Sequence, residues 1–549
     1  MKIKSLLVGM MACVALGACT NQDLVEDEIG NGNNASTDKA YIGIKIADPT
    51  NGFSRATSDG GFDYGTTDEH NITSAEFFFY KNGAYVTKGT IASSDITINE
   101  GSSNPNGNIE ANVPAVVVLH KKEGEIEYPN QVVAFLNLPS TVSSALESKS
   151  LSDALATVKT ISEIGDFATD KNFIMTNSVY YTGNNVVQNA VPVDAINFTQ
   201  TPEAATNTPV TIYVERVAAK VKMSKKEGGV TTSDIKIKYN GNDNYKLKLN
   251  IDGWGINAVN KSSYLVKNIT PATWNFTGWA WNDATNFRSY WAEDANYSTS
   301  GYPADWNAYN GKEENSPLEY RSWSDVVANN KATQYCLENT MDAATAGNIN
   351  ATTYMVIAGH YSLVDEKGNE SPVDVNTKLY KYIDNFYLEA DLLKVLANQA
   401  SLYTLQGETF TKLEASAYEI VRASLYDGKL VLKETTGNFY TDKNVESKVS
   451  ATEANEKLAE LGTFTAFAGG KTFFYTPIEH LNSNAEEDGH IGIVRNHTYE
   501  LTLNSISNLG NGVFDPDEDI IITEKSKEFY VAATLNILSW KVVNQGVDL

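Results

Sequence analysis

Histidine and carboxylate side chains are the first candidates for chemistry in this sequence. His480 and His490 flank the acidic run EEDG, and imidazoles combined with carboxylates form many metal sites. None of the six histidines belongs to an HExxH motif or pairs with a cysteine at the spacing of a zinc site. A solvated loop is therefore the favoured interpretation of this segment.

A second acidic group lies in the segment FDPDEDI. It places Asp515, Asp517 and Asp519 at alternating positions, as sites for hard cations often do. The segment lacks the glycine and the distal glutamate of a calcium-binding loop. We interpret it as incidental acidity and expect no metal ion there.

Aromatic side chains are concentrated between residues 274 and 306, where the rings could stack on sugars. The same rings could instead close the end of a β-sandwich or pack against a neighbouring subunit, and structural packing is the favoured interpretation. The tryptophans of this region are Trp274, Trp279, Trp281, Trp291 and Trp306.

Motifs for nucleophilic or nucleotide-dependent catalysis are absent from the sequence. It contains no GxSxG, no P-loop and no GxGxxG between a strand and a helix. The three cysteines, Cys13, Cys19 and Cys336, form no even disulfide framework, and no basic or metal-like cluster surrounds Cys336. The sequence therefore predicts a protein that is not an enzyme and needs no cofactor, with Cys336 as a structural thiol.

Charge and composition exclude one class of partner. The chain has a net charge of −25 and a pI near 4.7, whereas binding to a phosphate backbone needs basic patches. We therefore expect no nucleic acid partner. Hydrophobic residues make up 42% of the chain, which is enough to bury cores, and domains of roughly 100–200 residues would divide it into about two to four.

The N-terminal residues 1–19 have the pattern of an export signal. Two lysines precede an apolar run that is too short to span a bilayer, which needs about 20 residues. The run ends in LGAC, which resembles a bacterial lipobox and implies that Cys19 is acylated. An ordinary signal peptide with an incidental cysteine is the alternative. The polar, acidic residues after Cys19 predict a flexible tether.

Most of the remaining chain consists of strand patterns. Short alternating runs separated by turn signals, such as Asn82-Gly83, are typical of β-sandwiches. The sequence predicts an all-β fold of two sandwiches, residues 56–225 and 226–549. It predicts a long strand over 211–223 and short helical segments over 141–161, 389–400, 413–424 and 452–461.

A further strand pattern lies close to the N-terminus. Ile42, Ile44 and Ile46 alternate with other residues, which predicts a strand with one buried face. A turn-rich loop follows this strand and carries a single arginine, Arg55. A cut after Arg55 would free the strand and leave an apolar groove flanked by unpaired backbone edges.

The C-terminal segment, about 529–543, is long, extended and apolar, and such a chain end is a hazard if it is left free. It could fill the groove of another molecule by donor-strand addition, and head-to-tail addition that does not close builds a filament. One face of the segment carries Val531, Ala533, Leu535 and Ile537, and the other carries Leu538, Trp540 and Val542.

Several segments together resemble a known family. In chain order they are LGAC, GFSRATSDG, YVERVAAKV, GWGINAVNKSSYLVKN, IGIVRNHTYELTLNSI and LSWKVVNQGVDL. They resemble the Bacteroidales fimbrial shaft subunits, in particular the family of the minor (short) fimbrium major subunit. The resemblance implies two transthyretin-like β-sandwich domains and a surface fimbrium that supports adhesion.

The resemblance also implies how such a chain is processed and assembled. The precursor would be an outer-membrane lipoprotein, and an Arg- or Lys-specific surface protease would cut it between Arg55 and Ala56. Residues 20–55, the tether and first strand, would be a removed propeptide, and residues 529–543 would be the donor strand. The implied partners are other copies of the chain, head to tail, and fimbrial anchor and tip subunits.

Less specific interpretations of the two ends remain open. Arg55 could lie in an uncut loop, and residues 529–543 could form the last strand within their own chain. A different function, a lipid-anchored surface glycan-binding protein of a sugar-uptake system, fits the length and the tryptophans. Such proteins are mainly helical, whereas this sequence is dominated by strands.

Overall fold

Strands form most of the structure. The computed structural model describes residues 39–47, 66–91, 94, 96, 99–100, 111–120, 128–164, 172–178, 180–181, 187–269, 292–297, 299, 301–303, 316–478, 480, 492–506, 508–523, 532–538 and 543–545. Helices within these ranges are short, so the predicted all-β class is confirmed. None of the described helices is long and apolar enough to cross a membrane.

The first region is a sheet folded into two layers that share β13 (Val210–Arg216). Residues 210–213 pair in parallel with β1 (Lys39–Ala47), and residues 214–216 pair antiparallel with β8 (Met175–Asn177). The strand order is β3-β2-β6-β8-β13-β1-β5-β4, with β11 beside β6 and β12 beside β1. The remaining bounds are β2 Ala75–Lys81, β3 Ala84–Ile91, β4 Asn99–Glu100, β5 Ala111–His120, β6 Gln131–Leu136, β11 Val191–Pro192 and β12 Phe198–Thr199.

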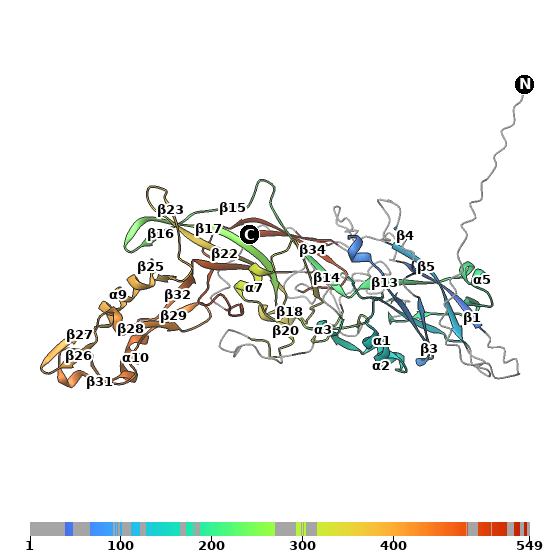
Figure 1. The fold of residues 1–549 in the computed structure, drawn as a ribbon, viewed down its shortest axis with the longest axis horizontal. Helices are drawn as coiled ribbons and strands as arrows, with labels where there is room; N and C mark the ends of the chain where they lie inside the picture. The colour runs from blue at the N-terminus through green and yellow to red at the C-terminus, as the bar shows by residue number, and fades with distance from the viewer. Residues whose placement is uncertain are drawn as a thin grey trace, which may run out of the picture.

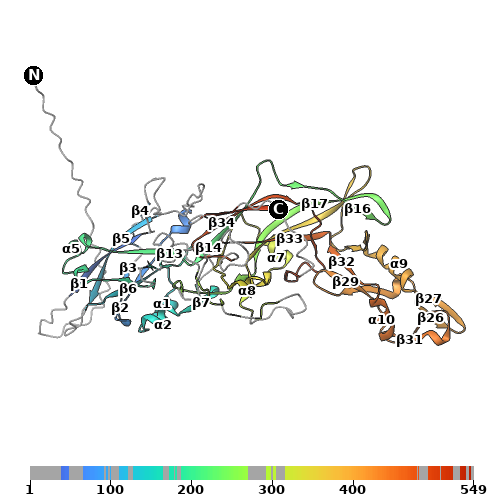
Figure 2. The same cartoon turned by 180° about the vertical axis from the view of Figure 1, so that it is seen from behind.

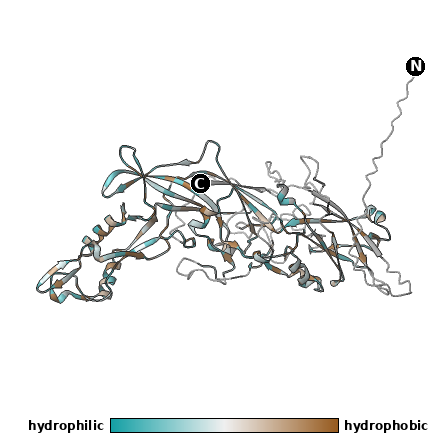
Figure 3. Ribbon diagram, in the orientation of Figure 1, coloured by the Kyte–Doolittle hydropathy of each residue, from teal (hydrophilic) through white to brown (hydrophobic). Residues whose placement is uncertain are grey.

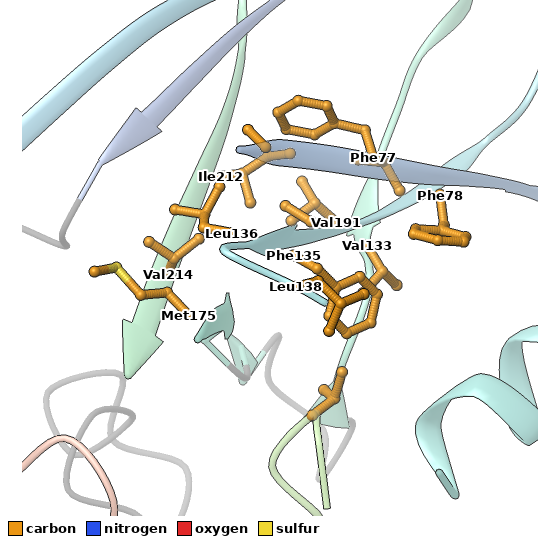
Figure 4. Packing of buried hydrophobic residues seen from close by; sticks show 14 of the residues in the cluster. Phe77, Phe78, Val133, Phe135, Leu136, Leu138, Met175, Val191, Ile212 and Val214 are labelled. Carbon is orange, nitrogen blue, oxygen red and sulfur yellow. The ribbon is translucent and has the colours of Figure 1, made fainter. Parts of the chain in front are cut away.

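The core of the first region lies between these two layers. Phe77, Phe78 and Phe79 of β2 are all buried because both faces of this strand are covered. Figure 4 shows Phe77 and Phe78 among the other side chains of this core. Gly89 of β3 faces Val117 of β5 so closely that a Cβ on the glycine would overlap the valine side chain. The two layers therefore pack at close quarters, as a sandwich requires.

The predicted hairpin at Asn82-Gly83 is confirmed. Both residues have positive φ, +50° and +82°, and they join β2 to β3. A two-residue turn with positive φ at both positions matches the right-handed twist of its strands.

The strand predicted over 211–223 is in fact two strands in different sheets. β13 ends at Arg216, and β14 (Ala218–Lys225) pairs with β21 (Thr333–Leu337) and β34 (Thr498–Ile506) of the second region. The interruption is Val217, whose N–H donates to the carbonyl of Ile174. The chain thus changes sheets at Val217; the domain boundary at 225/226 stays a prediction.

Two of the predicted helical segments differ from the structure. Residues 141–161 do not form one helix, because Ser148 has φ +67° and Ser150 caps a new helix. Within residues 413–424, a short 3-10 helix is followed by a strand that pairs with β29 (Asp427–Leu432), so the helix predicted over this range is wrong. The observed elements are α1 Ser140–Leu146, α2 Leu151–Leu155, β7 Val158–Thr160, α3 Ile161–Ile164, η6 Ala415–Ala417 and β28 Tyr418–Arg422.

The second region packs two sheets face to face. One has the order β21-β14-β34-β36-β37, with β15 beside β34, and the other runs β28-β29-β32-β24-β25-β16-β17-β22-β33-β35. Buried side chains of β14 and β34 meet those of β17, β22 and β33 between the sheets. The bounds are β15 Thr231–Thr232, β16 Ile235–Tyr239, β17 Asn242–Asn257, β22 Tyr354–Val364, β24 Lys378–Tyr382, β25 Asn385–Leu388, β32 Thr463–Ala468, β33 Lys471–Pro477, β35 Asn511–Gly512, β36 Ala532–Leu538 and β37 Val543–Gln545.

A smaller group of elements extends the second region away from the first, so that the molecule is elongated (Figures 1 and 2). α9 (Glu389–Ala400) and α10 (Ala451–Ala459) confirm two predicted helices and cover their own apolar cluster. The hairpin of β16 and β17 is largely hydrophilic at its tip (Figure 3). Also in this half are β26 Tyr403–Gln406, β27 Thr409–Lys412, β30 Asn438–Tyr440, β31 Lys448–Ser450 and α7 Trp323–Ala328.

Candidate assembly site

The N-terminal strand β1 is an interior strand of the first sheet. It pairs antiparallel with β5 over its whole length, from Lys39 opposite His120 to Ala47 opposite Asn112. Its other edge pairs with β12 and then with β13. Both backbone edges of β1 are therefore occupied.

The predicted buried face of β1 is confirmed at the two isoleucine side chains that the structure describes. Ile42 and Ile44 have 0% and 1% of their surface exposed and belong to the main apolar cluster of the first region. The backbone of Ile46 pairs with Val113 and Ile212, while its side chain lies outside the described residues. Burial of each isoleucine contributes about 1.5–3 kcal/mol.

The opposite face of β1 is covered by α5 (Pro202–Asn207), which the sequence did not reveal. Thr201 caps this helix by accepting a hydrogen bond from the N–H of Ala204 (3.2 Å), and Pro202 suits its first turn. The carbonyl of Ala205 lies against Gly43, and a Cβ on Gly43 would overlap it. A glycine inside an apolar alternation was the available signal, because such glycines mark close approach of another backbone.

The neighbouring strand β13 is anchored independently of β1. Lys267 donates to Glu215 near its end (2.9 Å), and both side chains are almost fully buried. The N–H of Arg216 donates to Asn496 (3.2 Å), and its Nε donates to the carbonyl of Glu69 (2.7 Å). Burial raises the pKa of Glu215 above its usual range despite the lysine. These contacts fix the end of β13 to Glu69, Lys267 and Asn496, and none of them involves β1.

The Glu215–Lys267 pair belongs to a buried ionic seam between the two regions, made of Glu69, Glu215, Lys220, Lys267, Glu338 and Arg495. Lys220 and Glu69 are 2.7 Å apart. Arg495 binds Glu338 and donates to the carbonyls of Leu265 (3.0 Å) and Tyr264 (2.9 Å). Buried charges of this kind must be paired, and the charged residues inside YVERVAAKV were the only hint of the seam in the sequence.

The C-terminal strand lies in the second region, away from β1. β36 pairs antiparallel with β34, and β37 pairs with β36. The backbones of Ala533, Leu535 and Ile537 lie opposite β34, while their side chains, and all of Val531, Trp540 and Val542, fall outside the described residues. Within one chain, residues 532–538 of this segment thus form a strand of the second region's own sheet.

Other predicted residues lie elsewhere or outside the described residues. Nine of them lie outside the described residues: Cys19, Arg55, Ala56, His490, Trp274, Trp279, Trp281, Trp291 and Trp306. His480 is buried and its Nδ1 lies 3.0 Å from the hydroxyl of Tyr499, so the solvated loop expected there is wrong at this residue.

Two further expectations concern thiol and acidic side chains. Cys336 is buried, and burial raises the pKa of its thiol to about 12, as suits a structural residue. In the acidic segment, the carboxylate of Asp515 accepts from the N–H of Asp517 (3.0 Å), and Asp519 is buried. Within the described part of the chain, no three His, Cys, Asp or Glu side chains gather as a metal site would require.

The C-terminal elements match a known family. Residues 465–546 match the family model of the C-terminal part of major fimbrial subunit protein type IV, fimbrillin. The matched range includes β33, β34, β36 and β37, and it confirms the resemblance to fimbrial subunits in this part of the chain. No curated protein matches the sequence.

Solved structures of fimbrial proteins are similar in outline. A fimbrilin from Porphyromonas gingivalis W83 is 15% identical, with 92% of this chain and 98% of that chain covered and a TM-score of 0.38. The C-terminally truncated tip fimbrial protein Mfa3 from Porphyromonas gingivalis is 11% identical, with 91% and 100% covered and a TM-score of 0.32.

Proposed function

We propose that this chain is a polymerising subunit of a cell-surface fimbria and that removal of residues 1–55 activates it. The fimbrillin match of residues 465–546 supports a structural, non-enzymatic fimbrial subunit. Acylated Cys19 would hold the precursor at the outer membrane until an Arg- or Lys-specific protease cuts after Arg55. The cut would separate residues 1–55, which include β1, from the rest of the chain.

The observation that carries this proposal is the interior position of β1. After a cut at Arg55, only non-covalent contacts would hold β1 between β5 and β13. Its departure would uncover two strand edges and the places of Ile42 and Ile44 in the core. Because exposed edges and apolar grooves favour addition of another strand, the trimmed molecule would be an acceptor.

The occupant of the groove would be the C-terminal strand of a second copy. The acceptor lies in the first region, and the C-terminal strands belong to the second, so one molecule carries both at different places (Figures 1 and 2). An interface between two different surfaces of identical molecules builds a ring or an open filament. A filament is the form that suits a fimbrial subunit.

Mass spectrometry of surface-assembled material tests the proteolytic step. Chains in filaments are expected to begin at Ala56, and Arg55→Ala should abolish cleavage, whereas Arg55→Lys distinguishes a protease that accepts lysine from one that requires arginine. Filaments whose chains begin at the acylated Cys19 would overturn the proposal.

Deletion of residues 529–549 tests the role of the C-terminal strand. The truncated precursor is expected to be cut normally and to remain monomeric, because its groove stays open and it offers no strand to another copy. Assembly of this variant at the normal rate would show that the C-terminal strand is not the donor.

A further inference from the structure

β1 is enclosed on both edges and on both faces. β5 lies along one edge and β12 and β13 lie along the other, while Ile42 and Ile44 are buried in the core on one face. On the opposite face, the carbonyl of Ala205 in α5 leaves no room for a Cβ at Gly43, and such a Cβ would lie 3.4 Å from the Cα of Pro209. A strand cut free from the chain could therefore not lift out of the sheet while α5 keeps this position.

Sliding along its own axis would not free β1 either. Residues two positions apart in a strand belong to the same face of the sheet. A slide of β1 by two positions would bring Tyr41 or Lys45 to the place of Gly43, and both of these residues have a Cβ. Because that place admits no Cβ, β1 can slide in either direction only after α5 has moved.

The segment that carries α5 is short and mostly polar. It comprises residues 200–209, between β12 and β13. Thr201 accepts a hydrogen bond from the first turn of the helix (3.2 Å), and Nδ2 of Asn197 donates to the carbonyl of Thr208 (3.1 Å), which closes the base of the segment. Ala205 is the buried residue of α5. Since short helices depend on packing for their stability, α5 is the element around β1 that can move at the lowest cost.

Resting on the proposed function, we infer that α5 is a latch over β1: after the cut at Arg55, β1 leaves the sheet only when α5 moves away from Gly43. α5 contacts β1, β12 and β5, so it lies across the strand that must leave. The cut would make release of β1 possible, and the stability of α5 would set its rate. A cut subunit would therefore keep its strand edges and apolar groove covered until α5 opens, which limits pairing with other proteins.

Two substitutions at exposed positions test the latch in opposite directions. In precursor cut by an arginine-specific protease, Thr201→Ala removes the helix cap and should speed release of the fragment that contains β1 by about fivefold. Thr206→Ala raises the helix propensity of α5 and should slow this release by about twofold. Size-exclusion chromatography with mass spectrometry measures the released fragment over time.

A substitution in another helix is the matched control. Ser150 caps α2 in the same way as Thr201 caps α5, by accepting from the N–H of Asp153 (3.2 Å), and α2 lies apart from β1 (Figures 1 and 2). Ser150→Ala should leave the release rate unchanged. The latch would be overturned if Thr201→Ala did not speed release, if Thr206→Ala did not slow it, or if Ser150→Ala sped it as much as Thr201→Ala.

Hydrogen exchange of the uncut precursor tests the order of events. The N–H of Ala205 donates to the carbonyl of Thr201 (3.2 Å), so its exchange reports opening of α5. If α5 opens before β1 leaves, this amide should exchange faster than the amides of β1 that pair with β5. Equal rates, or faster exchange in β1, would contradict the latch.

A disulfide between β1 and β12 separates failure of the latch from failure of the proposed function. Tyr41 and Thr199 are directly paired, and paired residues of antiparallel strands lie within the distance of a disulfide. A cut chain with Tyr41→Cys and Thr199→Cys should polymerise only after a reductant breaks the link. Polymerisation of the linked chain would overturn the proposed function. If the linked chain stays monomeric but the substitutions in α5 leave the release rate unchanged, the latch is wrong while the proposed function stands.

Discussion

β1 and β36 are strands near opposite ends of the chain, and their surroundings differ. β1 has strands paired along both edges and two isoleucines in a closed core. Within the described residues, β36 is paired fully with β34 on one edge and with the three-residue strand β37 on the other. Removal of β1 would therefore open the interior of a sheet, whereas release of β37 would break three residue pairs at the edge of a sheet.

The difference indicates how one chain can be both stable and ready to assemble. A strand that completes a core suits a removable propeptide, because its removal would leave an apolar groove that can accept another strand. Under the proposed function, the C-terminal strands lie at the edge of their sheet, so their release would not open the interior of that sheet. The seam between the two regions would keep β13 in place throughout, since its contacts do not involve β1.

The largest effect is expected when a charge is placed in the core next to β1. Ile44→Asp should destabilise the precursor by about 4 kcal/mol or more, because an unpaired carboxylate would be buried. Val86→Asp, at a partly exposed position of β3, is the control and should change stability little. Urea denaturation of the two variants measures the difference, and equal midpoints would contradict the interior position of β1.

The next largest loss of stability is expected from a substitution in the buried ionic seam. Lys267→Met would leave Glu215 buried without its partner and should cost about 3–5 kcal/mol, as the loss of one member of a buried pair does. Lys248→Met removes a surface pair with Glu370 and should cost less than about 1 kcal/mol.

The pH dependence of Lys267→Met follows from the raised pKa of Glu215. A carboxyl with a raised pKa in the folded state is tolerated while protonated, so its contribution is present at low pH and is lost as pH rises through the folded pKa. The deficit of Lys267→Met should therefore shrink in acid and grow toward neutral pH. A deficit that did not change with pH would contradict an ionised, buried Glu215.

A smaller effect is expected from the contact of β1 with α5. Gly43→Ala should destabilise the precursor by about 1–3 kcal/mol, because the added Cβ overlaps the carbonyl of Ala205. Gly255→Ala in β17 is the matched control, since its Cβ would lie 3.5 Å from the nearest atom of Val326. Thermal unfolding of both variants compares the two sites, and a neutral Gly43→Ala would mean that α5 yields easily.

The smallest effect on stability is expected from the pair of His360 and Asp252, which lies outside both β1 and β36. The Asp252 carboxylate, 2.8 Å from Nδ1 of His360, raises the pKa of the imidazole. Asp252→Asn should therefore lower the pKa of His360. In the unsubstituted protein, the stabilisation by this part-exposed pair should be lost as pH rises through the raised pKa of His360. NMR titration of His360 measures the shift, which should be the same in the precursor and in a chain lacking residues 529–549.

Local patterns predicted some elements correctly and failed at others for a physical reason. The hairpin at Asn82-Gly83 and helix α9 were predictable because turn residues and helical spacing act over a few positions. Residues 413–424 contain apolar residues at spacings that suit either a helix or a strand. The pairing of β28 with β29 decided in favour of a strand over residues 418–422. His480 was expected in solvent because nothing nearby in the sequence indicates that Tyr499 covers it.

The sequence by itself determined the alternation of Ile42, Ile44 and Ile46, the apolar alternation of the C-terminal segment and the position of Arg55 after the first strand. These are local properties, set by a two-residue period and by residue type. Only the tertiary structure decided that β1 lies between β5 and β13, that α5 covers Gly43 and that six buried charges join the two regions. Those features depend on hydrogen bonds and packing between residues far apart in the chain, which no local pattern specifies.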